Sequence, residues 1–152
     1  MSSRRASRTS AGLLGVVLAT VMLVACGGPD DGDEVPQPSA DSEARNAAIA
    51  GELQESFSQL PGVTSVEVNY QDNLTSPGSI AVRTQVGVGT EYGPLFDAMT
   101  EQIWLSELDP LNTIALSAGD GGSPPTADSR TLTPSRDADF AALENQYGPR
   151  PG

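Results

Sequence analysis

The segment that most constrains the fold is residues 80–88, IAVRTQVGV, because it alternates in polarity at every second residue. One side of an extended chain would carry Ile80, Val82, Thr84, Val86 and Val88, and the other side would carry Arg83 and Gln85. This period of two indicates a strand with one buried face, which needs neighbouring strands and an apolar layer to cover it. Since the 152 residues include a single cysteine, no internal disulfide can replace that hydrophobic core.

A helix and a further strand are predicted before this segment. The apolar residues at helical spacing are Ile49, Leu53, Phe57 and Leu60. Their period indicates a helix that Asp41 or Ser42 is suited to cap. Residues 66–70 then alternate as a strand, and QDNLTSPGS at residues 71–79 is rich in turn-forming residues. We therefore expect a hairpin in which nine residues connect the two strands.

The rest of the chain is predicted to continue with a helix, a strand and a C-terminal extension. Residues 91–108 have helical periodicity, and residues 113–118 alternate as a third strand. Residues 119–129 have the composition of a loop. The extension at residues 130–152 is expected to hold a short edge strand and a last amphipathic helix, which ends near Tyr147.

This order of elements predicts an α+β fold, a two-layer sandwich with a small mixed sheet of three or four strands. Because a right-handed crossover through the second helix returns the chain to the sheet, the third strand should run parallel to the second. Both main helices then cover one face of the sheet. The opposite face carries Glu67, Arg83, Gln85, Thr113 and Ser117. We expect it to contact water unless the last helix or a partner covers it.

The first 25 residues contain the three parts of an export signal. Arg4, Arg5 and Arg8 precede a fifteen-residue apolar run at residues 11–25, which leads into Cys26. As a helix this run would be about 22 Å long, which is short of the ~30 Å hydrocarbon layer of a membrane. The sequence therefore predicts a cleavable signal peptide at residues 1–25 rather than a permanent transmembrane helix.

The residues Leu23, Val24, Ala25 and Cys26 resemble the lipobox of bacterial lipoproteins. This resemblance implies that Leu23, Val24 and Ala25 are recognised by the signal peptidase, that Cys26 is the site of lipid attachment, and that the mature chain begins at Cys26. Two or more acyl chains would anchor the protein stably at the extracytoplasmic face of the cell membrane. A plain secretion signal and a buried core cysteine are the alternatives.

The chain after the predicted signal peptide, residues 26–152, is strongly acidic. Residues 26–42 are rich in proline and acidic side chains, which predicts a disordered tether, with a folded domain at residues 43–118. Residues 26–152 carry 20 carboxylates and five arginines, a net side-chain charge of −15. So negative a surface repels phosphate backbones, and we expect no nucleic-acid partner. The absence of lysine and the many Ala, Gly and Pro residues are typical of a GC-rich bacterial genome, such as that of an actinobacterium.

Little in the sequence points to catalysis. Histidine is absent, which removes the usual general base near neutral pH and the commonest metal ligand. We therefore assign no catalytic residue, metal or cofactor. Asp97 and Glu101 lie four residues apart on one predicted helix face, where like charges are usually solvated. We predict a non-catalytic interaction module with an envelope protein or a lipid as partner. The alternatives are an envelope hydrolase that uses this carboxylate pair and a small carrier of lipid or another apolar ligand.

The order helix-strand-strand-helix-strand over residues 43–118, behind an export signal, resembles the BON domain of bacterial envelope proteins. The local likeness is greatest in VRTQVGVGTEYGPLFDAM, residues 82–99. The resemblance implies an envelope location and an association with phospholipid, although the charge of −15 opposes binding to anionic headgroups. The sequence departs from the family in the nine residues at 71–79, where BON domains have a tight glycine turn, and in Pro110 and Leu111 before the third strand.

Overall fold

The computed structural model describes residues 39–151, which belong to one compact unit. Its elements are α1 (Ala40–Ser58), β1 (Val63–Asn73), β2 (Ser76–Val86), α2 (Tyr92–Trp104), β3 (Thr113–Asp120), β4 (Ala127–Leu132) and α3 (Asp137–Tyr147). The predicted signal peptide at 1–25, Cys26 and residues 27–38 of the tether lie outside the described residues. Within the described part, no helix is both long enough and apolar enough to span a membrane.

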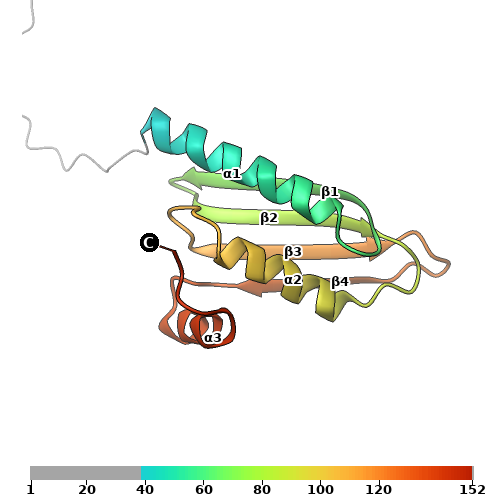
Figure 1. Ribbon diagram of the computed structural model, residues 1–152. Helices are drawn as coiled ribbons and strands as arrows, with labels where there is room; N and C mark the ends of the chain where they lie inside the picture. The colour runs from blue at the N-terminus through green and yellow to red at the C-terminus, as the bar shows by residue number, and fades with distance from the viewer. Residues whose placement is uncertain (1–38, 152) are drawn as a thin grey trace, which may run out of the picture. The chain divides into compact units, whose positions relative to one another are not determined.

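The four strands form one mixed sheet in the order β1-β2-β3-β4 (Figure 1). β2 runs antiparallel to β1 and parallel to β3, and β4 runs antiparallel to β3. α2 carries the chain between the two parallel strands, as the crossover rule predicts. α1 and α2 lie over one face of the sheet, and α3 packs beside α2. The predicted α+β class, mixed sheet and one-sided helical layer are confirmed.

The hydrophobic core fills the space between the helices and the covered face of the sheet. Its most deeply buried side chains are Phe57, Ile80, Val82, Phe96, Met99, Ile103, Trp104, Leu108, Ile114 and Leu116. Burying one such side chain contributes about 1.5–3 kcal/mol. The predicted buried face of residues 80–86 is therefore confirmed. Ile80, Val82 and Val86 all point into this layer, and the buried Thr84 lies between them.

The connection between β1 and β2 is shorter than predicted. β1 continues to Asn73 and β2 begins at Ser76, so only Leu74 and Thr75 join them. The expected nine-residue connection is therefore wrong. The side-chain Oδ1 of Asn73 accepts hydrogen bonds from the backbone N–H groups of Thr75 and Ser76, both at 3.0 Å. These local bonds close the turn and let the strand pairing run to its ends.

The connection between β3 and β4 is also shorter than the loop expected at residues 119–129. β3 extends to Asp120 and β4 begins at Ala127. The Asp120 carboxylate accepts hydrogen bonds from the backbone N–H groups of Thr126 and Gly122, at 2.8 and 3.2 Å, and so closes this hairpin. The bonds from Thr126, and then the one from Gly122, lower the pKa of Asp120.

The first helix begins earlier than predicted. α1 starts at Ala40, and Ser39 is its N-cap, with its Oγ accepting a hydrogen bond from the backbone N–H of Ser42 at 3.3 Å. The expected cap at Asp41 or Ser42 is therefore displaced by two or three residues. Both residues lie inside the first turn, where the negative charge of the Asp41 carboxylate interacts favourably with the positive end of the helix dipole.

Val88 is exposed, although its spacing predicted that it would be buried together with Ile80, Val82 and Val86. β2 ends at Val86, and Val88 is 77% exposed. The chain leaves the sheet at Gly87, whose carbonyl accepts hydrogen bonds from the backbone N–H and the side-chain hydroxyl of Thr90 at 3.2 and 2.7 Å. This turn lifts Val88 away from the core and leads into α2, which ends at Trp104 rather than at the predicted residue 108.

The C-terminal segment belongs to the fold. β4 completes the sheet beside β3, and Leu143 of α3 is buried. The indole N–H of Trp104 donates a hydrogen bond to the carbonyl of Gly148 at 2.8 Å. The Phe140 ring meets the indole edge-on, with 5.2 Å between ring centroids. These contacts fasten α3 and the residues after it to the end of α2.

Candidate functional site

The sheet face opposite the helices is the broadest surface that no described element covers. We call it the open face and define it by the outward side chains of the four strands. These are Ser65, Glu67, Asn69, Gln71, Ser79, Ala81, Arg83, Gln85, Thr113, Ala115, Ser117, Gly119, Ala127, Ser129 and Thr131. None of them is buried. The sequence predicted this face correctly, including Glu67, Arg83, Gln85, Thr113 and Ser117.

The open face has no net charge and no large apolar side chain. Its two charged residues, Glu67 and Arg83, lie opposite each other on neighbouring strands with 3.7 Å between their nearest charged atoms. The remaining side chains are small or amide-bearing, so the surface is flat and rich in hydrogen-bonding groups. The register places them in rows across the sheet, one of which runs through Asn69, Ala81, Ala115 and Thr131.

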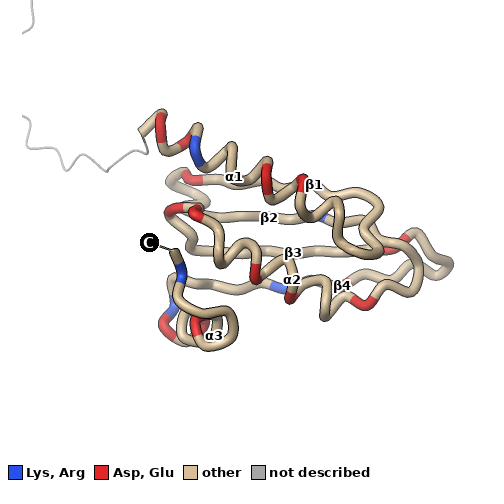
Figure 2. The backbone as a smooth tube through the Cα atoms, viewed as in Figure 1, with Lys and Arg blue, Asp and Glu red and all other residues tan. Residues whose placement is uncertain are grey.

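The described part of the chain as a whole is acidic, although the open face adds nothing to its net charge. Residues 39–151 carry 16 carboxylates and five arginines, a net charge of −11. Figure 2 shows acidic residues along α1, along α2 and in the segment that follows α2. A negatively charged partner would be repelled from this side of the molecule, whereas the open face imposes no such restriction.

Both edges of the sheet are protected by side chains. On β1, the Gln54 side-chain oxygen accepts a hydrogen bond from the backbone N–H of Val68 at 3.0 Å. At β4, Asp128 accepts from the backbone N–H of Ser129 and Asp139 accepts from that of Thr133, both at 2.8 Å. An extended peptide that added to either edge would have to displace these bonds.

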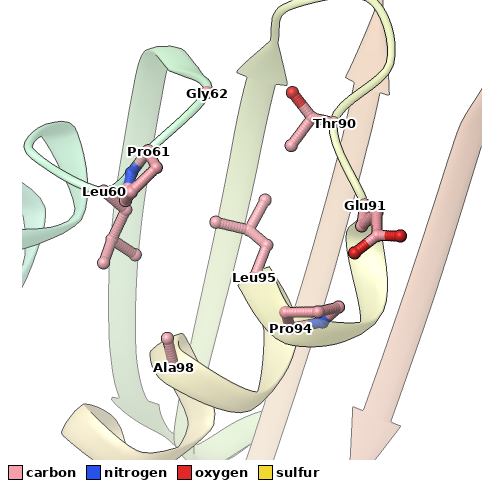
Figure 3. A pocket seen from close by; sticks show the side chains of 8 residues that line it. All are labelled: Leu60, Pro61, Gly62, Thr90, Glu91, Pro94, Leu95 and Ala98. Carbon is pink, nitrogen blue, oxygen red and sulfur yellow. The ribbon is translucent and has the colours of Figure 1, made fainter.

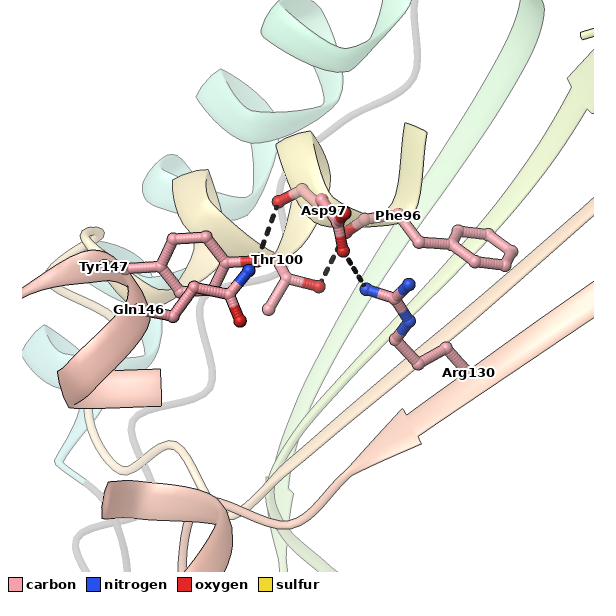
Figure 4. A network of polar contacts seen from close by, with 6 residues as sticks. All are labelled: Phe96, Asp97, Thr100, Arg130, Gln146 and Tyr147. Atoms are coloured by element: carbon pink, nitrogen blue, oxygen red, sulfur yellow. Dashed lines mark hydrogen bonds and ion pairs between the residues drawn. The ribbon is translucent and has the colours of Figure 1, made fainter. Parts of the chain in front are cut away.

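The proposed carboxylate pair does not converge on one site. Asp97 forms an ion pair with Arg130 of β4, with 2.5 Å between Oδ1 and Nη1 (Figure 4). The Arg130 guanidinium also lies 5.6 Å from the centroid of the Phe96 ring. Glu101 instead lines a groove between α1 and α2. The arrangement gives no support to a hydrolase that uses these two carboxylates together.

The Asp97 network joins three elements of the fold. The Tyr147 hydroxyl of α3 donates a hydrogen bond to the Asp97 backbone carbonyl at 3.4 Å and accepts one from the Gln146 amide at 3.0 Å (Figure 4). Burial, and then the negative charge of Asp97, raise the pKa of Tyr147. The network therefore connects α2, β4 and α3 through Asp97, Arg130 and Tyr147.

A hollow of about 370 Å³ lies where the turn after α1 meets the start of α2 (Figure 3). Its lining consists of Leu60, Pro61, Gly62, Thr90, Glu91, Pro94, Leu95 and Ala98. Glu91 is the one ionisable side chain among them, so a second acid or base for proton transfer is missing from the lining. The hollow opens to solvent, unlike the enclosed cavity that a lipid carrier needs.

A polar cluster that the sequence analysis missed holds the segment between α2 and β3. Asn46 of α1 is 3% exposed, and its amide donates to the Asp109 carbonyl at 2.8 Å. The Tyr70 hydroxyl of β1 donates to the Pro110 carbonyl at 2.7 Å. Burial, and then the charges of Asp72 and Asp109, raise the pKa of Tyr70 to about 12. The available signal was the position of Asn46 on the apolar line of α1, three residues before Ile49.

No metal site is formed by the residues that the structure describes, since nowhere among them do three or more ligating side chains converge. The predicted lipid-attachment residue Cys26 and the recognition residues Leu23, Val24 and Ala25 lie outside that part of the chain.

Comparisons with known proteins show a distant structural likeness but no matching family. Neither a protein-family model nor a curated protein matches the sequence. Among solved structures, the chain is similar to the type III secretion system protein EscJ of enteropathogenic E. coli, with a TM-score of 0.44 and 20% sequence identity. The similar region covers 58% of this chain and 55% of EscJ, so it spans about half of that protein. A likeness of this degree assigns neither a family nor a function.

Proposed function

We propose that this protein is a lipid-anchored lipoprotein of the bacterial cell envelope and that its folded domain binds an envelope protein through the open face. The domain performs no catalysis in this proposal. The observation that carries it is the open face itself: the four strands expose one side, while α1 and α2 cover the other and α3 packs beside α2. Sheets with antiparallel strands commonly pack one face on the core and expose the other, which leaves that face free for contacts with another protein.

The lipid anchor is supported by the sequence alone. Leu23, Val24, Ala25 and Cys26 have the lipobox pattern at the end of an apolar run that is too short to span a membrane. Residues 26–38 would then connect the anchored cysteine to α1, which begins at Ala40. A chain of thirteen residues can extend roughly 40 Å, which is enough to hold the domain clear of the lipid surface.

A protein partner is favoured over a lipid because of the side chains on the open face. Lipid binding by a surface relies on apolar insertion or on basic side chains. The open face has no large apolar group, and its one arginine, Arg83, is paired with Glu67. Hydroxyl and amide groups instead suit the polar contacts of a protein interface.

The size of the open face limits the strength of binding. Four strands spaced ~4.8 Å apart, each with about eight residues rising ~3.3 Å, give a surface of roughly 500 Å². A stable interface buries about 800 Å² on each partner. The partner would therefore also contact the loops at the ends of the strands, or would bind transiently.

The anchor can be tested by metabolic labelling with an alkyne fatty acid in a bacterial host. We expect the wild-type chain to be labelled in the membrane fraction and the Cys26→Ala variant to remain unlabelled. Equal labelling of the two proteins, or a mature N-terminus upstream of Cys26, would contradict the lipoprotein assignment.

The binding surface can be tested by introducing a photo-crosslinking amino acid at Ala115, in the centre of the open face. Ala142 of α3, which is exposed on the helical side, is the matched control. In intact cells of the source bacterium, we expect Ala115 to give a discrete crosslinked species that Ala142 does not give. Identical patterns from both positions, or no adduct from Ala115, would count against the open face as the binding surface.

A further inference from the structure

A groove between α1 and α2 forms a second surface, on the helical side of the molecule. It has a volume of about 540 Å³ and an apolar floor built from Ile49 and Leu53 of α1 and from Leu105, which directly follows α2. We call it the interhelical groove. Leu53 belongs to the core at 7% exposure, whereas Leu105 is 42% exposed. The floor of the groove therefore includes both a core side chain, Leu53, and a side chain that contacts water, Leu105.

Polar contacts define the two ends of the groove. At one end, the Ser56 hydroxyl donates a hydrogen bond to the side-chain oxygen of Gln102 at 2.6 Å. At the other end, Arg45 and Glu107 form an ion pair at 2.5 Å. These contacts join α1 to α2 and to the turn after it. The apolar floor lies between these two contacts and is open to solvent.

The rim of the groove is acidic. Glu52 of α1 and Glu101 of α2 both line it and are exposed, and neither forms an ion pair with any residue that the structure describes. Glu55 follows on the same helix, so the potential along α1 remains negative. Acidic side chains around an apolar floor complement a partner that combines apolar side chains with lysine or arginine.

From this combination we propose that the interhelical groove binds a basic amphipathic helical segment of another protein. One or two large apolar side chains of the segment would cover Leu105 and the floor beside it, and its lysine or arginine side chains would lie against Glu52 and Glu101. This is the helix-in-groove mode of recognition, in which apolar residues at helical spacing give most of the affinity and flanking charges set specificity. The site is separate from the open face and does not depend on it.

The exposed leucines provide a matched pair for the test. Leu105 lies in the groove, and Leu74 lies at the tip of the β1–β2 turn with 81% exposure. Replacing either by aspartate places one extra charge on the surface and removes one exposed apolar side chain. A difference in binding between Leu105→Asp and Leu74→Asp therefore reports on position and not on composition.

We would measure binding of a fluorescent peptide by anisotropy to the full chain in phosphatidylcholine nanodiscs, with empty discs as the blank. The probe is a leucine/lysine peptide of about four helical turns, with leucines at i, i+3, i+4 and i+7. A scrambled peptide of the same composition and a leucine/glutamate peptide serve as controls. We expect saturable binding of the amphipathic basic peptide alone. Stronger binding to empty discs than to the loaded ones, or equal binding of the scrambled peptide, would overturn the proposal.

Variants then localise the site. We expect Leu105→Asp to weaken binding at least tenfold and Leu74→Asp less than twofold. The double variant Glu52→Gln/Glu101→Gln should weaken it roughly three- to tenfold, because each exposed charge pair contributes little in water. Glu67→Gln/Glu144→Gln makes the same change in net charge away from the groove and should have less than half this effect. Equal losses from the two double variants would show diffuse attraction to an acidic protein, and the proposal would be wrong.

Discussion

The two faces of the sheet are formed by the same strands but differ in burial, in polarity and in the size of their side chains. Toward the helices, the strands present Ile80, Val82, Ile114 and Leu116, which are at most 2% exposed. Toward solvent, the same strands present polar residues and alanines, none of which is buried. The charge also differs, since acidic residues occur along α1 and α2 while the open face is neutral overall. One period-two pattern therefore predicts both the buried face and the exposed face of the sheet.

The largest expected effect compares neighbouring residues of β3 that point to opposite faces. Leu116→Ala removes a side chain that is 2% exposed and should lower the free energy of unfolding by about 3 kcal/mol. Ala115→Ser, on the open face, should change it by less than about 0.5 kcal/mol. Urea denaturation followed by circular dichroism measures both. Similar losses in the two variants would mean that the open face is covered in solution.

The next comparison uses two asparagines. Asn46→Ala leaves the backbone groups of Asp109 without their partner and should cost about 2 kcal/mol of unfolding free energy. Asn69→Ala, on the open face of β1, should cost less than about 0.5 kcal/mol. The same denaturation experiment serves both variants. An equal cost would show that the Asn46 cluster contributes no more than a surface residue does.

A smaller effect is expected at alkaline pH from Tyr70, whose side chain points to the covered side of β1. Its pKa is raised from 10.0 to about 12 in the folded protein, mainly by burial. The stabilisation is therefore complete below pH 10 and is lost as the pH rises from 10 towards 12. Because the ring is only partly buried, solvent screens the effect, and we expect the free energy of unfolding to fall by about 1 kcal/mol over this range. Thermal unfolding from pH 8 to 11.5 measures it, and Tyr70→Phe should remove this part of the pH dependence. An unchanged profile in that variant would assign the loss to other groups.

The smallest effect compares an ion pair on each side of the sheet. Asp97→Asn breaks the contact with Arg130, which links α2 to β4, and should cost about 0.5–1 kcal/mol. Glu67→Gln breaks the wider pair with Arg83 on the open face and should cost no more than about 0.3 kcal/mol. Chemical denaturation at low salt and in 1 M NaCl tests this, because salt should reduce the difference. A larger loss from Glu67→Gln would reverse the comparison.

The sequence predicted the elements and the division between faces, because both follow from periodicity. It did not predict the lengths of the two hairpin connections. Those depend on single side chains, Asn73 and Asp120, which accept hydrogen bonds from the backbone and extend the strands on either side. Residues typical of a turn can also lie at the end of a strand, so composition overestimated both connections.

The groove and the Asn46 cluster could not be predicted for a different reason. The spacing of Leu53 and Ile103 shows which side of each helix faces the sheet, but it carries no information about the distance between the helices. That distance depends on contacts such as the one from Ser56 to Gln102, which join residues far apart in the sequence. The hydrogen bond from Asn46 to Asp109 likewise joins residues far apart in the sequence, so no local sequence pattern predicts it.

The position of the chain's one tryptophan makes the last helix observable without a label. Trp104 is buried, donates its indole N–H to Gly148 and meets the ring of Phe140. Release of α3 would expose the indole to water while the sheet and the other helices remained folded. Intrinsic fluorescence, red-shifted on such exposure, would therefore distinguish detachment of the C-terminal helix from unfolding of the whole domain.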